Sequence, residues 1–531
     1  MSAPKVLLVY PNFDAPSFWD FRAACELAGK RASLPPLGLI TIAALFPPDW
    51  QIRLVDRNIE KLAEADIDWA DLVMTGGMIP QRSDSLRLLG LAHQRGKPVV
   101  IGGPDVTSSP DVYAAAEFRI FGEAETTIAE LVAAWQRGER SGTFAAERYK
   151  TDVTRSPVPR FDLLQVDAYL SLGLQFSRGC PFTCEFCDII ELYGRVPRTK
   201  EPAQILAELD AIYATGYRGT IYFVDDNLIG NKKAVKAFLP HLRKWLEDHG
   251  FPFDFATEAS INLADDDDLL RLLGETNFGA VFIGIESPDA ETLVSTSKKQ
   301  NTRRALAESI DKIYAAGLFV SAGFILGFDS EKGSVATGMI DCIEDMTIPI
   351  AMVGLLTALP ETQLTRRLVR EARLDPATDL DFAGDIGGDQ CTAGLNFRTT
   401  RARRDILADY RDVLRRVYRP EAFFDRTRQL SAKLVRPALP TKFQPAIMLQ
   451  DAGTIGRVFW RLATRDRRLG LPFLRTLLGC LVSNPAAVKP IVSQMILYFH
   501  LGPFADYVIA HLDGEIAALD AAGREPRLAT A

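Results

Sequence analysis

The sequence predicts an α/β protein in three parts: an open parallel sheet, a partial (β/α)6 barrel and a helical C-terminal region. Short β-branched runs alternate with helical segments in residues 1–140 and again in residues 166–400, which predicts the two sheets. Residues 401–531 lack that alternation and are expected to be helical. A chain of 531 residues is too long for one hydrophobic core.

The first part has five candidate strands, and nearly all of them end in turns or small residues. The strands are expected at residues 5–10, 51–56, 72–75, 98–101 and 118–121. In open α/β sheets, ligands bind beyond the carboxyl ends of the strands, where glycine lets a bulky group approach the backbone. We therefore expect a large planar or nucleotide-tailed ligand at the loop residues Asn58, Gly76, Gly77, Gly102, Gly103, Gly122 and Glu123.

A linker is expected at residues 141–165, because the run Ser156–Arg160 contains two prolines and is extended by composition. Six strand candidates follow, each with a helical pattern behind it, at residues 173–177, 220–224, 253–257, 280–284, 319–326 and 350–357. Right-handed crossovers repeated along one sheet curl it into an open barrel.

Polar residues and glycines close several barrel strands, at the edge where barrel enzymes place their chemistry. A carboxylate that ends an apolar strand needs a cationic or hydrogen-bonding partner. The alternatives are helix capping for Asn227 and close strand–helix packing for the glycines. The ligand-binding candidates are Asp225, Asn227, Glu258, Glu286, Gly323 and Gly327.

Three cysteines, Cys180, Cys184 and Cys187, form a C-x3-C-x2-C run. Structural zinc uses four ligands, usually in two pairs, and the sequence has no second pair. Seven cysteines is an odd number, which argues against a disulfide framework. Thiolates holding an iron–sulfur cluster are therefore the preferred interpretation. Three ligands leave the fourth iron open.

This cysteine pattern resembles the radical S-adenosylmethionine superfamily, whose expected fold is the partial barrel. The resemblance implies that the three cysteines hold a [4Fe-4S] cluster and that its open iron binds S-adenosylmethionine. It also implies that Phe186 lies against the adenine and that the six strand-end candidates surround the rest of the cofactor.

The glycine-looped first domain, placed ahead of the cysteines, resembles the cobalamin domain of many radical enzymes. Domains that supply a lower axial ligand use D-x-H-x-x-G, whereas here the second strand ends Asp56–Lys61 without a histidine. His93 is expected on the surface. Cobalamin would thus bind at the seven loop residues without a protein imidazole; otherwise the domain is a vestigial flavodoxin-like fold or a nucleotide binder.

Residues 189–200, 223–233, 324–333 and 354–363 resemble the branch of these enzymes that includes the hopanoid 2-methylase. The branch implies methylation of an unactivated carbon in a small molecule, with a polycyclic lipid as one candidate substrate. It also implies an external electron donor such as a flavodoxin or ferredoxin. The alternatives are a radical oxidative cyclase and a cobalamin or redox sensor without turnover.

The net charge of −7 gives no reason to expect a nucleic-acid partner. The N-terminus reads as a strand and not as a signal peptide, and no apolar run is long enough to span a membrane, so we expect a cytoplasmic protein. Basic and aromatic residues at 457–468 flank the apolar stretch 469–482. This pattern fits a helix at the inner membrane surface or a helical cap over the barrel.

Overall fold

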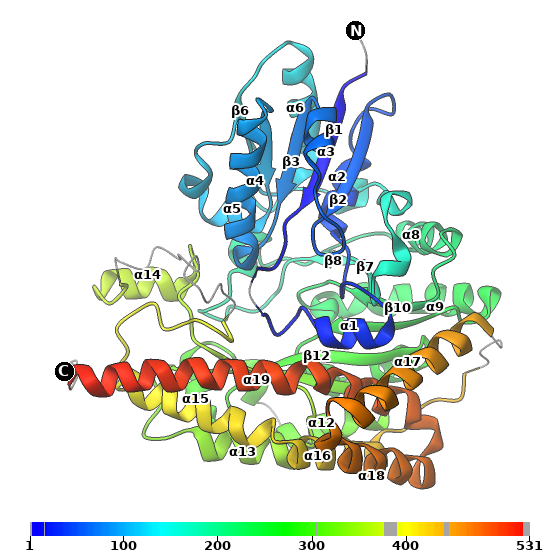
Figure 1. The fold of residues 1–531 in the computed structure, drawn as a ribbon, viewed down its shortest axis with the longest axis vertical. Helices are drawn as coiled ribbons and strands as arrows, with labels where there is room; N and C mark the ends of the chain where they lie inside the picture. Colours follow the sequence, from blue (N-terminus) through cyan, green and yellow to red (C-terminus); the bar gives the residue numbers. More distant parts are fainter. Residues whose placement is uncertain (1–2, 15, 303–304, 376–389, 440–444, 524–531) are drawn as a thin grey trace.

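The computed structural model describes residues 3–14, 16–302, 305–375, 390–439 and 445–523. Its three parts follow one another down the long axis (Figure 1). The first sheet lies at the top, the second sheet lies below it, and the C-terminal helices cover the lower part. The two sheets and the helical C-terminal region confirm the predicted fold class.

The first sheet has six parallel strands in the order β2-β1-β3-β4-β5-β6. They are β1 Lys5–Tyr10, β2 Gln51–Asp56, β3 Leu72–Gly76, β4 Val99–Gly102, β5 Phe118–Phe121 and β6 Gly142–Ala145. Alternate residues of β1 enter two cores: Leu7 and Val9 face one side of the sheet, and Val6 and Leu8 face the other. Both faces are therefore buried, as in other parallel sheets with helices on each side.

Five helices accompany this sheet: α2 Leu37–Ala43, α3 Glu64–Trp69, α4 Arg82–Gln94, α5 Pro104–Ser108 and α6 Ala124–Gln136. Helix α1, Arg22–Ala28, comes from the same part of the chain but packs on the C-terminal helices. Strand β6 lies in the segment that the sequence predicts as a linker. Its pairing with β5 is parallel and runs from Gly142 to Ala145, so the first domain continues beyond residue 140. The short strand has only one apolar aromatic residue, Phe144, and therefore carries a weak sequence signal.

The second sheet also has six parallel strands, in the order β14-β13-β12-β11-β10-β7. They are β7 Ser171–Leu174, β10 Gly219–Phe223, β11 Phe253–Glu258, β12 Phe278–Glu286, β13 Phe319–Leu326 and β14 Ala351–Leu355. All six predicted strands are present, with bounds shifted by a few residues. Consecutive strands are neighbours throughout, as expected for repeated βα units in a partial barrel.

Helices connect the barrel strands: α7 Ile189–Leu192, α8 Pro202–Ala214, α9 Lys232–His249, α10 Asp267–Glu275, α11 Ala290–Ser295, α12 Leu306–Ala315, α13 Ala336–Asp345 and α14 Gln363–Arg370. The predicted face of α8 is the buried one, with Ile205, Leu209 and Ile212 fully covered. Pro202 opens this helix, where its missing N–H is not needed.

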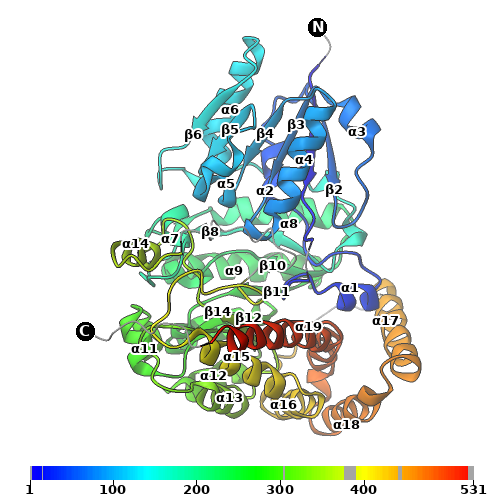
Figure 2. The same cartoon turned by 60° about the vertical axis from the view of Figure 1, so that its left-hand side comes forward.

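The C-terminal region is helical as predicted. Its helices are α15 Arg403–Val417, α16 Pro420–Lys433, α17 Pro445–Thr464, α18 Arg467–Ser483 and α19 Val488–Ala522. The hydroxyl groups of Tyr410 and Tyr418 donate to the carbonyls of Val353 and Ala351 on β14, so these helices cap the last barrel strand. α19 runs past α1, as Figure 2 also shows. Among the described helices, none is long and apolar enough to cross a bilayer.

The carboxyl ends of the two sheets face each other. Arg178, in the segment after β7, forms an ion pair with Glu123, which follows β5 of the first sheet. Helix α7, in the same barrel segment, contacts α5, which follows β4. Ligands of open parallel sheets bind at these edges. The fold therefore places the two predicted cofactor edges on either side of one interface.

Candidate functional site

The three cysteines lie in a loop that a short antiparallel hairpin closes. Its strands are β8 Ser177–Arg178 and β9 Arg198–Thr199. Gly179 has a φ of +97°, and a Cβ there would lie 2.9 Å from the carbonyl oxygen of Gly194. The Cys180 amide donates to that same carbonyl at 3.2 Å. The glycine in the motif is thus required because the loop folds back on its own backbone.

Amide side chains reach two of the cysteine sulfurs. Asn227 Nδ2 donates to Cys180 Sγ, and Gln300 Nε2 donates to Cys184 Sγ, both at 3.8 Å. Burial raises the pKa of the Cys180 and Cys187 thiols. Thiolates at these positions therefore need a compensating positive charge, which bound iron supplies. N–H groups that donate to ligand sulfurs are also a feature of iron–sulfur sites.

The arrangement fits a multinuclear cluster better than a single ion. Within the described part of the chain, no three His, Cys, Asp or Glu side chains converge as ligands of one metal ion. In a four-iron cluster each thiolate binds a different iron, so the sulfurs need not converge on one point. Three thiols in one loop, with amide donors to two of them, fit such a cluster.

Asp225 supports this loop through hydrogen bonds to its backbone. Its carboxylate is fully buried and accepts bonds from the amides of Phe176 at 2.9 Å and Ser177 at 2.5 Å, and from Ser177 Oγ at 2.6 Å. These contacts give the carboxylate partners within the protein, and its direct contact with a cofactor stays a prediction. Asp225 positions the strand that leads into Cys180.

Glu286 ends β12 and finds its cationic partner within the protein. Its Oε1 lies 2.6 Å from Lys298 Nζ, and both side chains are nearly buried. Burial lowers the pKa of Lys298, but the nearby Glu286 carboxylate and Cys184 outweigh this effect and raise it, so the ammonium stays charged. The predicted need for a cation was sound, but the sequence analysis missed Lys298, which lies twelve residues later, beyond α11.

A cluster of carboxyl groups lies at the ends of β10 and β11. Burial raises the pKa of Glu258 to about 7, while a hydrogen bond from Tyr222 partly opposes this change. Burial and the neighbouring Glu258, Asp225 and Asp188 raise the pKa of Asp226 to about 8. These groups therefore take up protons near neutral pH. Asp226 was not among the predicted site residues.

Of the residues predicted to lie near the adenine, Phe186 and Gly327 are connected through Phe328, whereas Gly323 has other neighbours. Phe186 packs on Phe328 with ring centres 5.7 Å apart, and Phe328 directly follows Gly327 at the end of β13. Gly327 has a φ of +104°, and a Cβ there would lie 2.5 Å from the Leu395 side chain. A Cβ on Gly323 would lie 3.1 Å from the Phe282 ring. Close packing thus accounts for both glycines, and their contact with the adenine stays a prediction.

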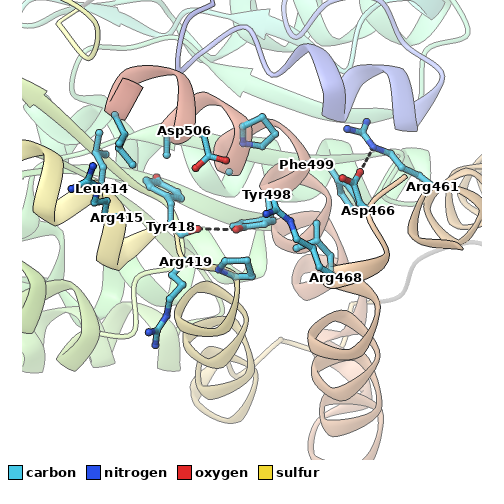
Figure 3. Close-up of a pocket in the computed structure, with 16 residues that line it drawn as sticks. Leu414, Arg415, Tyr418, Arg419, Arg461, Asp466, Arg468, Tyr498, Phe499 and Asp506 are labelled. Carbon is cyan, nitrogen blue, oxygen red and sulfur yellow. Dashed lines mark hydrogen bonds and ion pairs between the residues drawn. The ribbon is translucent and has the colours of Figure 1, made fainter. Parts of the chain in front are cut away.

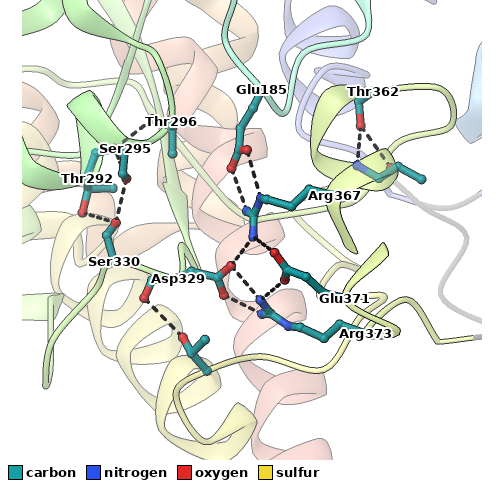
Figure 4. A network of polar contacts seen from close by, with 12 residues as sticks. Glu185, Thr292, Ser295, Thr296, Asp329, Ser330, Thr362, Arg367, Glu371 and Arg373 are labelled. Atoms are coloured by element: carbon teal, nitrogen blue, oxygen red, sulfur yellow. Dashed lines mark hydrogen bonds and ion pairs between the residues drawn. The ribbon is translucent and has the colours of Figure 1, made fainter. Parts of the chain in front are cut away.

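An ionic network ties the cysteine loop to α14 (Figure 4). Glu185, between Cys184 and Phe186, accepts two bonds from Arg367 at 2.8 and 3.2 Å. Arg367 also pairs with Asp329 at 2.8 Å, and Asp329 pairs with Arg373 at 2.5 Å. The loop is therefore held from the barrel side by charges that follow β13 and β14.

The glycine loops of the first domain are explained by their own packing. A Cβ on Gly76 would lie 2.5 Å from the Gly102 carbonyl oxygen, and one on Gly103 would lie 3.3 Å from the backbone of Gly77. Gly122 has a φ of +76° and faces Ala146. The backbones of the loops after β3 and β4 are in direct contact, which leaves no room for a side chain. The glycines are therefore not by themselves evidence of a ligand.

Asn58 and Glu123 also have partners within the protein, and their contact with cobalamin stays a prediction. Asn58 accepts from the Phe13 amide at 3.2 Å and donates to the Pro11 carbonyl at 3.1 Å, joining the loops after β1 and β2. Glu123 pairs with Arg178 at 2.9 Å and with Arg198 at 2.7 Å. His93 lies on the surface, as expected, near Glu117.

Arg178 is the centre of the contact between the two domains. Besides Glu123 it pairs with Glu125 at 2.6 Å, and all three side chains are largely buried. Burial raises the pKa of Glu125, but Arg178 and the Ser156 hydroxyl outweigh it and lower the value to about 2. We call these residues, with Arg198, the interdomain clamp. The clamp attaches the hairpin of the cysteine loop to the first sheet.

A cavity of about 190 Å³ lies elsewhere, between α15, α18 and α19 (Figure 3). None of the predicted site residues lines it. Its walls mix arginines with Asp466 and Asp506, and Arg461 already pairs with Asp466 at 2.7 Å.

Known proteins resemble the chain at the levels of sequence and fold. Residues 174–335 match the radical SAM superfamily, and residues 362–513 match a domain of unknown function, DUF4070. The chain is 46% identical to an uncharacterized methyltransferase of Synechocystis, covering 91% of this chain and 89% of that protein. It is 34% identical to the hopanoid C-2 methylase of Rhodopseudomonas palustris, covering 93% of each chain.

A solved structure with a similar fold is the cobalamin-dependent S-adenosylmethionine radical enzyme OxsB, with aqua-cobalamin and S-adenosylmethionine bound. Its TM-score is 0.58 at 14% identity, covering 99% of this chain and 82% of that chain. This identity establishes likeness of fold only, whereas the hopanoid C-2 methylase matches over nearly its whole length at higher identity. The chain therefore belongs to the radical SAM superfamily, in the family of methyltransferases that includes the hopanoid C-2 methylase.

Proposed function

We propose that this chain methylates an unactivated carbon of an apolar, polycyclic lipid of the hopanoid kind. The observation that carries the proposal is that the cysteine loop, at the carboxyl edge of the barrel, meets the carboxyl edge of the first sheet. When bound, a [4Fe-4S] cluster, S-adenosylmethionine and cobalamin supply the hydrogen abstraction and the methyl group. The protein has to hold these groups close together and exclude water.

The residues of the barrel edge have separate tasks in this proposal. Cys180, Cys184 and Cys187 hold the cluster, while Asn227 and Gln300 donate to two of the sulfurs. Lys298 offers a buried ammonium beside the loop for the carboxylate of S-adenosylmethionine, and Glu286 keeps that ammonium charged and oriented. This geometry requires no side-chain base for the transfer.

Cobalamin is proposed to bind outside β1 and β3, where the strand order of the first sheet reverses. Four of the five histidines, at positions 93, 241, 249 and 511, lie on helices away from this edge, whereas His500 of α19 lies 2.9 Å from the Ser17 carbonyl oxygen in the segment after β1. The loops after β1 and β3 contain no histidine of their own, so cobalamin is proposed to bind without an imidazole from these loops. Its neighbours would come from the loops after β1 and β3 and from the facing cysteine loop.

An apolar substrate is supported by the inner face of the barrel sheet. Phe282 and Gly284 share this face of β12 because strand residues alternate sides. Trp19, from the segment after β1, packs edge-on against Phe282 with ring centres 5.3 Å apart. A Cβ on Gly284 would point at the Glu286–Lys298 pair. An aromatic surface thus adjoins the proposed cofactor site.

The proposed cellular setting has two parts. A one-electron donor such as a flavodoxin or ferredoxin would reduce the cluster. The lipid would reach the enzyme at the cytoplasmic face of the inner membrane, through the C-terminal helices.

The deciding experiment compares lipid extracts of cells with and without the gene by mass spectrometry. In parallel, the purified enzyme is assayed with S-adenosylmethionine labelled in its methyl group. We expect a lipid that gains one labelled methyl, together with both 5′-deoxyadenosine and S-adenosylhomocysteine. A product without an added methyl would favour the oxidative cyclase. Absence of S-adenosylmethionine cleavage in reduced protein would favour the sensor.

A further inference from the structure

Helix α17 presents its apolar side outward. Its large exposed side chains are Met448, Leu449, Ile455, Phe459 and Trp460, and Leu449 is 75% exposed. At 100° per residue these positions fall on one side of the helix. The inner side of α17 buries Val458 and Leu462, and the exposed Arg457 donates from Nε to the Leu27 carbonyl of α1 at 2.7 Å. The helix therefore has apolar side chains on its outer side as well as on its buried side.

Helix α18 has two apolar faces. Leu469, Phe473 and Cys480 are buried against the protein on one of them. On the opposite face the exposed residues are Leu471, Leu474, Leu478, Leu481 and Val482, with 77% of Leu471 and 87% of Val482 accessible. The helix is too apolar on its outer face for a surface that stays in water. We call the outer faces of both helices the α17–α18 surface.

Positive charge accompanies this apolar surface. Residues 445–483 contain six arginines and two aspartates, a net charge of +4, whereas the whole chain carries −7. Arg465, Arg467, Arg468 and Arg475 are all exposed. Amphipathic helices with a basic rim bind anionic lipid through burial of apolar side chains and electrostatic attraction. A second copy of the chain would bring like charges together, which disfavours self-association through this surface.

We propose that the α17–α18 surface docks on an anionic lipid bilayer, with both helices lying in the plane of the interface. The docking takes its purpose from the proposed lipid substrate, but its evidence is independent of that function. The other side of α17 packs on α1. In the segment that leads into α1, the Trp19 ring contacts the Phe282 ring on the inner face of the barrel. Docking through the α17–α18 surface would therefore place the bilayer near α1, and the segment leading into α1 borders the proposed substrate region inside the barrel.

Vesicle flotation with the full-length chain tests the proposal, using phosphatidylcholine vesicles with or without phosphatidylglycerol. We expect binding to the anionic vesicles that falls as salt increases. The double variant Leu471→Gln, Leu478→Gln should lower the partition coefficient at least about tenfold, because two leucines lose their insertion into lipid. The control is Val369→Gln on α14, which is 57% exposed and lies far from this surface in Figure 1.

Equal binding of the wild type and the double variant would overturn the proposal, and so would equal binding to both kinds of vesicle. Sedimentation showing a dimer that the double variant abolishes, without vesicle binding, would also overturn it in favour of a second copy as occupant. These measurements need no turnover. A chain that binds vesicles but transfers no methyl group to a lipid would refute the proposed function and leave the docking intact.

Discussion

From the interdomain clamp we predict that a single carboxylate, Glu125, stabilises the contact between the two edges at which the cofactors are proposed to bind. The perturbation is Glu125→Gln, which keeps the shape of the side chain and removes its charge. Glu125 Oε1 lies 2.6 Å from Arg178 and accepts from Ser156 Oγ at 2.7 Å, in a largely buried position. Arg178 would keep Glu123 as its remaining ionic partner.

The magnitude follows from the pKa of Glu125, which is lowered from 4.5 to about 2. That difference corresponds to about 3 kcal/mol of folding free energy, as an order of magnitude. Because the pKa is lower in the folded protein, the contribution is complete above pH 4.5 and is lost as the pH falls toward 2. The variant should therefore be less stable than the wild type at pH 7, and the difference should shrink below pH 4.5.

Anaerobic urea unfolding at neutral and acidic pH measures this effect. The control is Glu139→Gln, whose pair with Arg137 is exposed, so a change below about 0.5 kcal/mol is expected. A second readout is the ratio of 5′-deoxyadenosine to methylated product. If the clamp aligns the cysteine loop with the first sheet, this ratio should be higher in Glu125→Gln than in the wild type. A loss of stability at pH 7 no larger than that of Glu139→Gln would refute the reasoning.

Three further predictions concern the barrel edge. Cys184→Ala should lose the bound iron and the visible absorbance of the cluster, whereas Cys342→Ala should keep both; iron retained by Cys184→Ala would contradict the ligand assignment. Lys298→Met should weaken S-adenosylmethionine binding about tenfold or more in equilibrium dialysis at unchanged iron content, because a buried ammonium is lost, and Lys299→Met is its control. Asp226→Asn should raise the melting temperature at pH 8 but not at pH 4, since the unfolded state loses its proton near pH 3.8, whereas the folded state keeps its proton until about pH 8. A stabilisation that is equal at both pH values would contradict the burial of this carboxyl group.

The predictable features were those encoded in short stretches of chain. Strand–helix alternation gave all six barrel strands, and five of the six strands of the first sheet. Strand β6 escaped because its four residues, Gly142–Ala145, form a strand only by pairing with β5. Cysteine spacing identified the loop because Cys180, Cys184 and Cys187 lie within eight residues.

Partners distant in sequence were beyond prediction. The sequence placed Asp225 and Glu123 correctly at the ends of strands, but their partners are supplied by other elements: the Phe176 and Ser177 amides for Asp225, and Arg178 with Arg198 for Glu123. Lys298 was foreseeable only as an unspecified cation that Glu286 required.

The sequence by itself determined the fold class and the cysteine motif, because helical and strand periodicity and the spacing of thiols are local properties. Only the tertiary structure decided which polar groups remain available to a ligand. A carboxylate or glycine at a strand end looks the same in sequence whether it meets a cofactor or another loop, and long-range packing settles which. Tertiary packing also leaves apolar side chains of α17 on the outer surface. From the sequence alone, this region could be either a cap over the barrel or a helix at the membrane surface.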